Sequence, residues 1–164
     1  AAGHEVELLP VSELDFPLLR SKLYFESNEP PPDIVRCQAS IAGADHLVII
    51  HPLWLGSMPA LLKGFLEQVF RPGFAFAKPD TPGRPGAKLL KGKSARVIVT
   101  MGMPGFAYKW FYRAHAVKSL ERNILAFTGF GPIHRTLIGM VEANGDRGRK
   151  KRLAEVRKLG REGA

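Results

Sequence analysis

Cysteine is nearly absent from this sequence, and so are long apolar runs. Cys37 is the only cysteine among 164 residues, which excludes a disulfide framework within the chain and makes a reducing cytoplasm the expected location. No stretch approaches the roughly 18 apolar residues that a membrane-spanning helix needs. Hydrophobic residues still make up 45% of the chain, enough for the core of one domain over residues 1–164, and Cys37 is expected in that core.

Motifs for hydrolysis and for metal binding are also missing. The five histidines show no spacing typical of metal ligands, so no metal site is expected. The segment "LGSMP" lacks the glycine pair that flanks a hydrolase nucleophile. The segment "KGKS" lacks the first glycine of a phosphate-binding loop, because Ala87 stands there, and it precedes a predicted strand instead of following one.

Positive charge is present in excess but is confined to two segments. The formal net charge is +9; residues 144–164 hold eight Lys/Arg against three acids, and residues 78–96 hold six against one. The favoured interpretation is two solvated basic segments. The alternative, a nucleic-acid or anionic-membrane partner, is not favoured.

Strand-like and helix-like segments alternate along the chain. Such alternation predicts an α/β fold, a doubly wound parallel sheet with helices on both faces. Asp33 is expected to cap the first helix, and Gly129 to end the long third helix. The expected strands are 4–9, 45–50, 95–100 and 133–141, and the expected helices are 33–44, 59–70, 107–129 and 147–160.

The first residues, "AAGHEVELL", resemble the end of a helix followed by a strand. In this architecture a strand should precede that helix, so we expect the given sequence to lack about 25–30 residues, the usual size of such a unit. The missing first strand would lie between strands 4–9 and 45–50, in the middle of the sheet.

Two loops at predicted strand ends carry unusual side chains. "HPLWLGSMP" (51–59) and "TMGMPGFAY" (100–108) are rich in Gly, Pro, Met and aromatic residues and nearly free of charge. Ligands of open parallel sheets sit at the carboxyl ends of the strands. These loops suit a large flat apolar ligand such as an isoalloxazine ring. The alternative for Trp54 is that it anchors its loop to the core.

Three segments resemble one family of enzymes. "HPLWLGSMPALLKGFLEQVFRPGFAF", "VTMGMPGFAY" and "GFGPIHRTLIGMV" are similar to the flavin loops and the last strand of flavodoxin-fold NAD(P)H:quinone oxidoreductases. That family includes mammalian quinone reductases and bacterial potassium-efflux ancillary oxidoreductases. Its phosphate-holding loop follows the first strand, which is absent here, so the resemblance implies poor flavin binding for a chain that truly starts at residue 1.

The resemblance implies roles for individual residues. Tyr108 takes the place of the active-site tyrosine, and His115 lies one position beyond that of the family's histidine; the alternatives are core packing for Tyr108 and a solvent-facing position for His115. Phe74 and Phe76 would cover the site across a homodimer interface. The implied flavin contacts are Pro52, Leu53, Trp54 and Leu55 for the ring, and Thr100, Met101, Gly102 and Met103 for the ring edge and ribityl chain.

The implied activity is transfer of hydride from NAD(P)H, through bound FMN or FAD, to a quinone or similar small electron acceptor. One alternative is a non-catalytic electron-transfer flavodoxin, although such proteins are usually acidic. Another is a regulatory subunit that docks on an anionic partner through residues 147–161.

Overall fold

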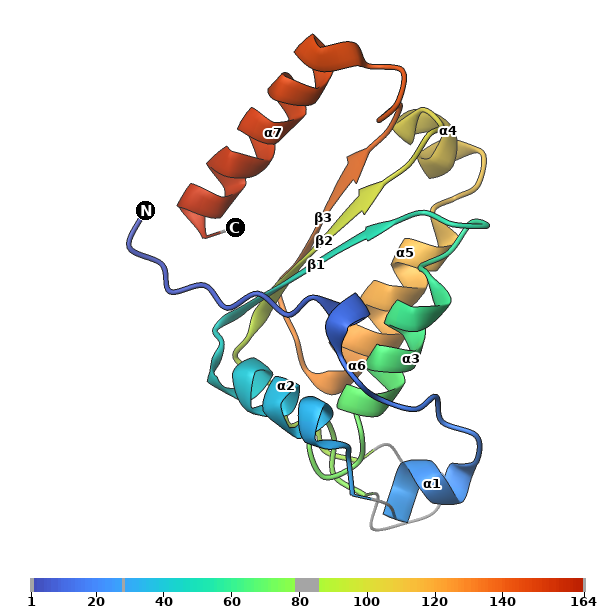
Figure 1. The fold of residues 1–164 in the computed structure, drawn as a ribbon, viewed down its shortest axis with the longest axis vertical. Helices are drawn as coiled ribbons and strands as arrows, with labels where there is room; N and C mark the ends of the chain where they lie inside the picture. The colour runs from blue at the N-terminus through green and yellow to red at the C-terminus, as the bar shows by residue number, and fades with distance from the viewer. Residues whose placement is uncertain (1, 28, 79–85, 164) are drawn as a thin grey trace.

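The computed structural model describes residues 2–27, 29–78 and 86–163, and part of the basic segment 78–96 therefore lies outside the described residues. Strands and helices alternate from residue 32 onward (Figure 1). The elements are η1 (Val11–Glu13), α1 (Lys22–Ser27), α2 (Pro32–Gly43), β1 (His46–Pro52), α3 (Ala60–Val69), β2 (Ser94–Thr100), α4 (Gly105–Trp110), α5 (His115–Ser119), the π-helix η2 (Leu120–Leu125), α6 (Ala126–Thr128), β3 (Ile133–Ile138) and α7 (Gly145–Glu162).

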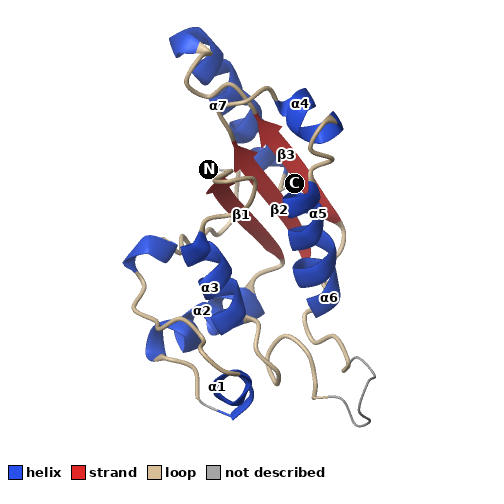
Figure 2. Cartoon of the chain, turned by 90° about the vertical axis from the view of Figure 1, so that its right-hand side faces the viewer, coloured by secondary structure: helices blue, strands red, loops and turns tan. Residues whose placement is uncertain are grey.

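The strands form one parallel sheet in the order β1-β2-β3, which confirms the predicted α/β architecture. Figures 1 and 2 show α3, α5 and α6 against one face of the sheet and α7 on the other side. The core lies under the first group of helices, where the side chains of Val97 and Val99 in β2 are fully buried. Cys37 of α2 belongs to this core, as the sequence predicts.

The opposite face of the sheet is buried along β2, where Ile98 is 4% exposed, but is open along β1. α7 lies on that side but has no buried residue, and Val48 and Ile50 of β1 remain exposed. β1 pairs with β2 along one edge, and within the described residues no strand pairs with its other edge.

Residues 4–9 form no strand, so this prediction was wrong. A strand is stabilised by backbone hydrogen bonds to a neighbouring strand, and the described residues offer none here. Side chains hold the segment instead. The ring of His4 lies 3.1 Å from the carbonyl oxygen of Arg161 in α7, and the Glu7 carboxylate accepts a 2.8 Å hydrogen bond from the Ser40 hydroxyl in α2.

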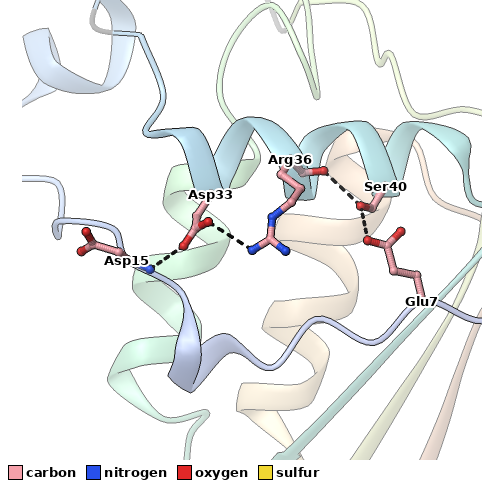
Figure 3. A network of polar contacts seen from close by, with 5 residues as sticks. All are labelled: Glu7, Asp15, Asp33, Arg36 and Ser40. Atoms are coloured by element: carbon pink, nitrogen blue, oxygen red, sulfur yellow. Dashed lines mark hydrogen bonds and ion pairs between the residues drawn. The ribbon is translucent and has the colours of Figure 1, made fainter.

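Asp33 does not cap α2, because Pro31 occupies the N-cap position and Asp33 lies within the first turn. Its carboxylate accepts hydrogen bonds from the backbone N–H of Asp15 (2.8 Å) and from Arg36 (3.1 Å), which ties the N-terminal segment to the helix (Figure 3). The Asp15 N–H and the Arg36 guanidinium together hold the pKa of Asp33 below its usual value.

The long helix expected over residues 107–129 is interrupted. Arg113 and Ala114 adopt left-handed backbone angles (φ 53° and 49°), which break the helical hydrogen-bond ladder after α4. The second half ends at Gly129, as predicted. There φ is 121°, and a β-carbon would lie 2.9 Å from the backbone of Leu90 and Lys91.

Truncation of Val97 to alanine should lower the free energy of unfolding by about 2 to 3 kcal/mol, because it opens a cavity in the buried centre of the sheet. Val48→Ala is the matched control, since this side chain is 46% exposed and Val97 is 0% exposed. Urea denaturation of both variants measures the difference. Equal losses would contradict the assignment of β2 as the buried strand.

His51→Phe should make stability less sensitive to acid. Burial lowers the pKa of His51 below its ordinary 6.5, and the ring Nε2 is buried without a hydrogen-bond partner in the described residues. Because the unfolded chain then binds a proton more readily than the folded protein, this histidine does not reduce stability above pH 6.5 and lowers it as the pH falls below 6.5. Thermal melts across this window should show a smaller decline in the variant, and an unchanged slope would refute the role of His51.

Candidate functional site

The two loops singled out in the sequence meet at the carboxyl end of the sheet. In the parallel register of β1 and β2, Pro52 lies opposite Thr100. One residue further on, the backbone N–H of Leu53 donates a 2.7 Å hydrogen bond to the carbonyl of Thr100. The segments that follow, 53–58 and 101–104, therefore start side by side.

The first loop is a tight turn that turns apolar side chains outward. The backbone groups of Trp54 and Ser57 exchange two 2.9 Å hydrogen bonds, and the residues between them, Leu55 and Gly56, both have positive φ (46° and 77°). This is the geometry of a type I′ turn. Trp54 is 63% exposed and Leu55 is fully exposed, so Trp54 does not anchor the loop in the core.

The left-handed backbone conformation of Leu55 is strained. A leucine in this conformation costs roughly 1–2 kcal/mol, because its β-carbon approaches the following carbonyl oxygen. Asn or Gly is the usual residue at such a position. Nothing in the packing compensates for this cost, since the Leu55 side chain faces solvent. Strain of this kind is concentrated at ligand-binding sites.

The second loop is fixed to the end of β3 by its carbonyl groups. Met101 and Met103 accept hydrogen bonds from the backbone N–H groups of Val141 (3.3 Å) and Met140 (3.2 Å). Among the described residues, no hydrogen bond to the N–H of Gly102 or Met103 is recorded. A β-carbon at Gly102 would meet no atom within 4 Å, so protein packing does not explain the glycine. The Met101 side chain is buried, so only the backbone of this residue is available to contact a ligand at the loop.

Tyr108 lies away from this surface. Its ring is 2% exposed and belongs to the core next to Ala114 and Val117. Burial raises the pKa of Tyr108, and the nearby Val117 N–H and Arg135 oppose that rise. Its hydroxyl has no well-aligned hydrogen-bond partner among the described residues. Behind it, Glu121 pairs with Arg135, yet burial still raises the pKa of Glu121.

Three further residues were expected at the site, namely His115, Phe74 and Phe76. His115 is exposed at the start of α5. Phe74 and Phe76 follow α3. Phe76 forms a β-bridge with Lys88, which lies in the segment that leads into the start of β2. This is the end of the sheet opposite to the two loops. Within one chain these two phenylalanines therefore do not line the two loops.

Sequence reasoning missed a cluster of exposed aromatic residues on and after α4. Phe106, Trp110, Phe111 and Tyr112 are all more than half exposed. A cleft of about 560 Å³ lies between α4, the chain after β3 and α7. The signal was the density of aromatic residues in "FAYKWFY" (106–112), most of which falls within the helix expected over residues 107–129.

Two kinds of site are not found in the part of the chain that the structure describes. No group of three or more His, Cys, Asp or Glu side chains is placed to hold a metal ion. No helix combines the length and the apolar character needed to cross a membrane.

Known proteins share both the sequence pattern and the fold. A Haemophilus influenzae protein named as an uncharacterized NAD(P)H oxidoreductase is 30% identical over 121 residues, which is 73% of this chain and 58% of that protein. The chain thus spans little more than half the length of this relative. The crystal structure of Smu.1420 from Streptococcus mutans matches with a TM-score of 0.69 and 32% identity, over 80% of this chain and 68% of that one.

An NAD(P)H:quinone oxidoreductase from Methanothermobacter marburgensis superimposes over 98% of this chain and 81% of its own, with a TM-score of 0.79. At 24% identity, this likeness shows the fold. The model of a family described by its flavodoxin-like fold matches residues 1–159. The resemblance drawn from the loops is confirmed, and the chain belongs to the flavodoxin-like fold family.

Proposed function

We propose that this chain belongs to a flavin-dependent oxidoreductase that uses NAD(P)H to reduce a quinone or a similar small electrophile. The observation that carries the proposal is the pair of loops at the carboxyl end of the sheet: Trp54 and Leu55 of the first loop face solvent, and the N–H groups of Gly102 and Met103 in the second have no recorded hydrogen bond among the described residues. The name of the Haemophilus influenzae relative supports the same reaction class.

The residues present fit the ring of a flavin. The isoalloxazine system has an apolar face and a polar edge, and it needs both an apolar wall and hydrogen-bond donors. Trp54 and Leu55 supply the wall, with Pro52 and Leu53 at its base. The open space above Gly102 lets a ligand approach the amides of the second loop closely. A flavin, when bound, supplies hydride transfer between NAD(P)H and the acceptor.

The chain's own residues then have binding and orienting roles. Trp54 and Leu55 shield one ring face from water, and the N–H groups of Gly102 and Met103 donate to the polar edge. Thr100 and Met101 hold the second loop in place through the ladder to β1 and β3. The assignments of Tyr108 and His115 as hydrogen-bond donors to the acceptor remain predictions, and for Tyr108 they require its buried ring to become accessible.

We further propose that the protein acts as a homodimer in the cytoplasm. Phe74 and Phe76 lie at the wrong end of the sheet to cover their own chain's loops, and a second copy is the source that the resemblance implies. The exposed aromatic residues after α4 are further apolar surface that such an assembly could bury.

Incubation of the full-length protein with excess FMN should give a yellow protein whose colour NADPH bleaches under anaerobic conditions. Trp54→Ala should weaken FMN binding about tenfold, because stacking of a ring on an aromatic side chain contributes roughly 1–3 kcal/mol. Leu89→Ala is the control, since Leu89 is an exposed leucine in the segment leading into the start of β2. A protein that stays colourless with FMN and with FAD would refute the proposal.

Leu55→Gly should stabilise the protein and weaken flavin binding at the same time. Glycine relieves the left-handed strain, and after the entropy it adds to the unfolded state the expected net gain is about 0.5–1 kcal/mol. Gly56→Ala should destabilise the protein, because it places a β-carbon on a residue with φ 77°. Thermal melts and FMN titration measure the two effects. A less stable Leu55→Gly protein would show that no strain is stored in this turn.

A further inference from the structure

The cleft between α4 and α7 has the size and position of a second ligand site. Its volume of about 560 Å³ is within the range of roughly 300–1,000 Å³ typical of small-molecule pockets. One wall is α4, the floor is the chain from Leu137 to Met140, and Arg152 of α7 closes the other side. Figure 1 shows that α4 and the start of α7 both stand near the carboxyl end of β3.

The α4 wall presents two aromatic side chains to solvent. Phe106 and Trp110 are four residues apart and therefore share one face of the helix. They are 71% and 77% exposed, so packing in the core does not explain either ring. Both rings line the cleft, which makes this wall a platform for a flat aromatic ligand.

The polar lining of the cleft is positive. Lys109 and Arg152 line it, and no acidic side chain among the described residues does. No ion pair or hydrogen bond of Lys109 is recorded among the described residues, whereas Arg152 pairs with Glu155 of its own helix at 2.8 Å. Both partners of that pair are nearly half exposed, so the pair is weak and the guanidinium can contact an anion as well.

The floor of the cleft is well defined. The side-chain amide of Asn144 donates a 3.0 Å hydrogen bond to the carbonyl of Gly139. A β-carbon at Gly139 would lie 2.4 Å from the backbone nitrogen of Gly105, so the chain after β3 is held directly against the start of α4. Pro104 and Gly105, which line the cleft, directly follow Met103 of the proposed flavin loop.

We propose that this cleft binds the base and phosphate of a purine nucleotide, with the base stacked on Phe106 and Trp110 and the phosphate held by Lys109 and Arg152. An aromatic platform and two cations at one site match that combination of chemistry. Because the cleft begins one residue beyond the flavin loop, the nucleotide is the adenylate half of NAD(P)H. This last assignment rests on the proposed function.

Titration of the apoprotein with AMP tests the site directly. In a Trp54→Phe background Trp110 is the remaining tryptophan, and AMP should quench its fluorescence in a saturable manner. Adenosine should bind more weakly, and inorganic phosphate should not quench at all. Lys109→Ala and Arg152→Ala should each weaken AMP binding about tenfold, the loss typical of a hydrogen bond to a charged group.

Arg149→Ala is the charge-matched control, because Arg149 pairs with Asp146 on α7 and does not line the cleft. It should leave AMP binding unchanged. Absence of saturable quenching by AMP, or equal weakening by Arg149→Ala, would overturn the site. This titration requires no flavin, so its failure is distinct from failure of the proposed function.

Kinetics of the FMN-loaded protein identify the source of the nucleotide. Lys109→Ala should raise KM for NADPH about tenfold and leave KM for reduced nicotinamide mononucleotide, which lacks the adenylate, unchanged. Saturable AMP binding combined with unchanged KM values would reject the assignment to NAD(P)H. The cleft would then bind a free nucleotide. Normal turnover without AMP binding would be consistent with the proposed oxidoreductase function and would reject the proposed nucleotide site in the cleft.

Discussion

The parallel register of β1, β2 and β3 is the constraint on which the candidate site depends. β2 is buried along most of its length, and its backbone is paired on both sides. This arrangement places Pro52 opposite Thr100 and Thr100 opposite Ile138, so three chain segments leave the sheet at one level. The turn at Trp54, the amides after Met101 and the cleft beside α4 all follow from that alignment.

Periodicity and strand-end rules predicted much of this fold. The apolar runs 47–50 in β1 and 97–99 in β2 have no polar interruption, which is the pattern of strands buried in a parallel sheet. The failures have physical causes. Residues 4–9 alternate like a strand, but a pattern cannot supply the neighbouring backbone that a strand requires. The helix expected over 107–129 is broken by left-handed residues at Arg113 and Ala114, which neither Arg nor Ala signals in sequence.

The location of the site was predictable, but the direction of its side chains was not. The rule that ligand loops follow the carboxyl ends of parallel strands predicts that the two loops lie together. Burial then divided their residues, because Met101 faces the core and Trp54 faces solvent. Tyr108 is in the core, a position that the sequence left open. The cleft joins α4 to Arg152, more than forty residues away along the chain, and no local pattern announces such a pairing.

The outer edge of β1 has a practical consequence for solution work. Within the described residues β1 has no partner along one edge, and such an edge with exposed aliphatic side chains, here Val48 and Ile50, is a template for pairing with another chain. Where that edge stays open, self-association should rise with protein concentration, and the net charge of +9 provides the opposing repulsion. Added salt would screen that repulsion and strengthen apolar association together, so solubility should be greatest in dilute, low-salt buffer.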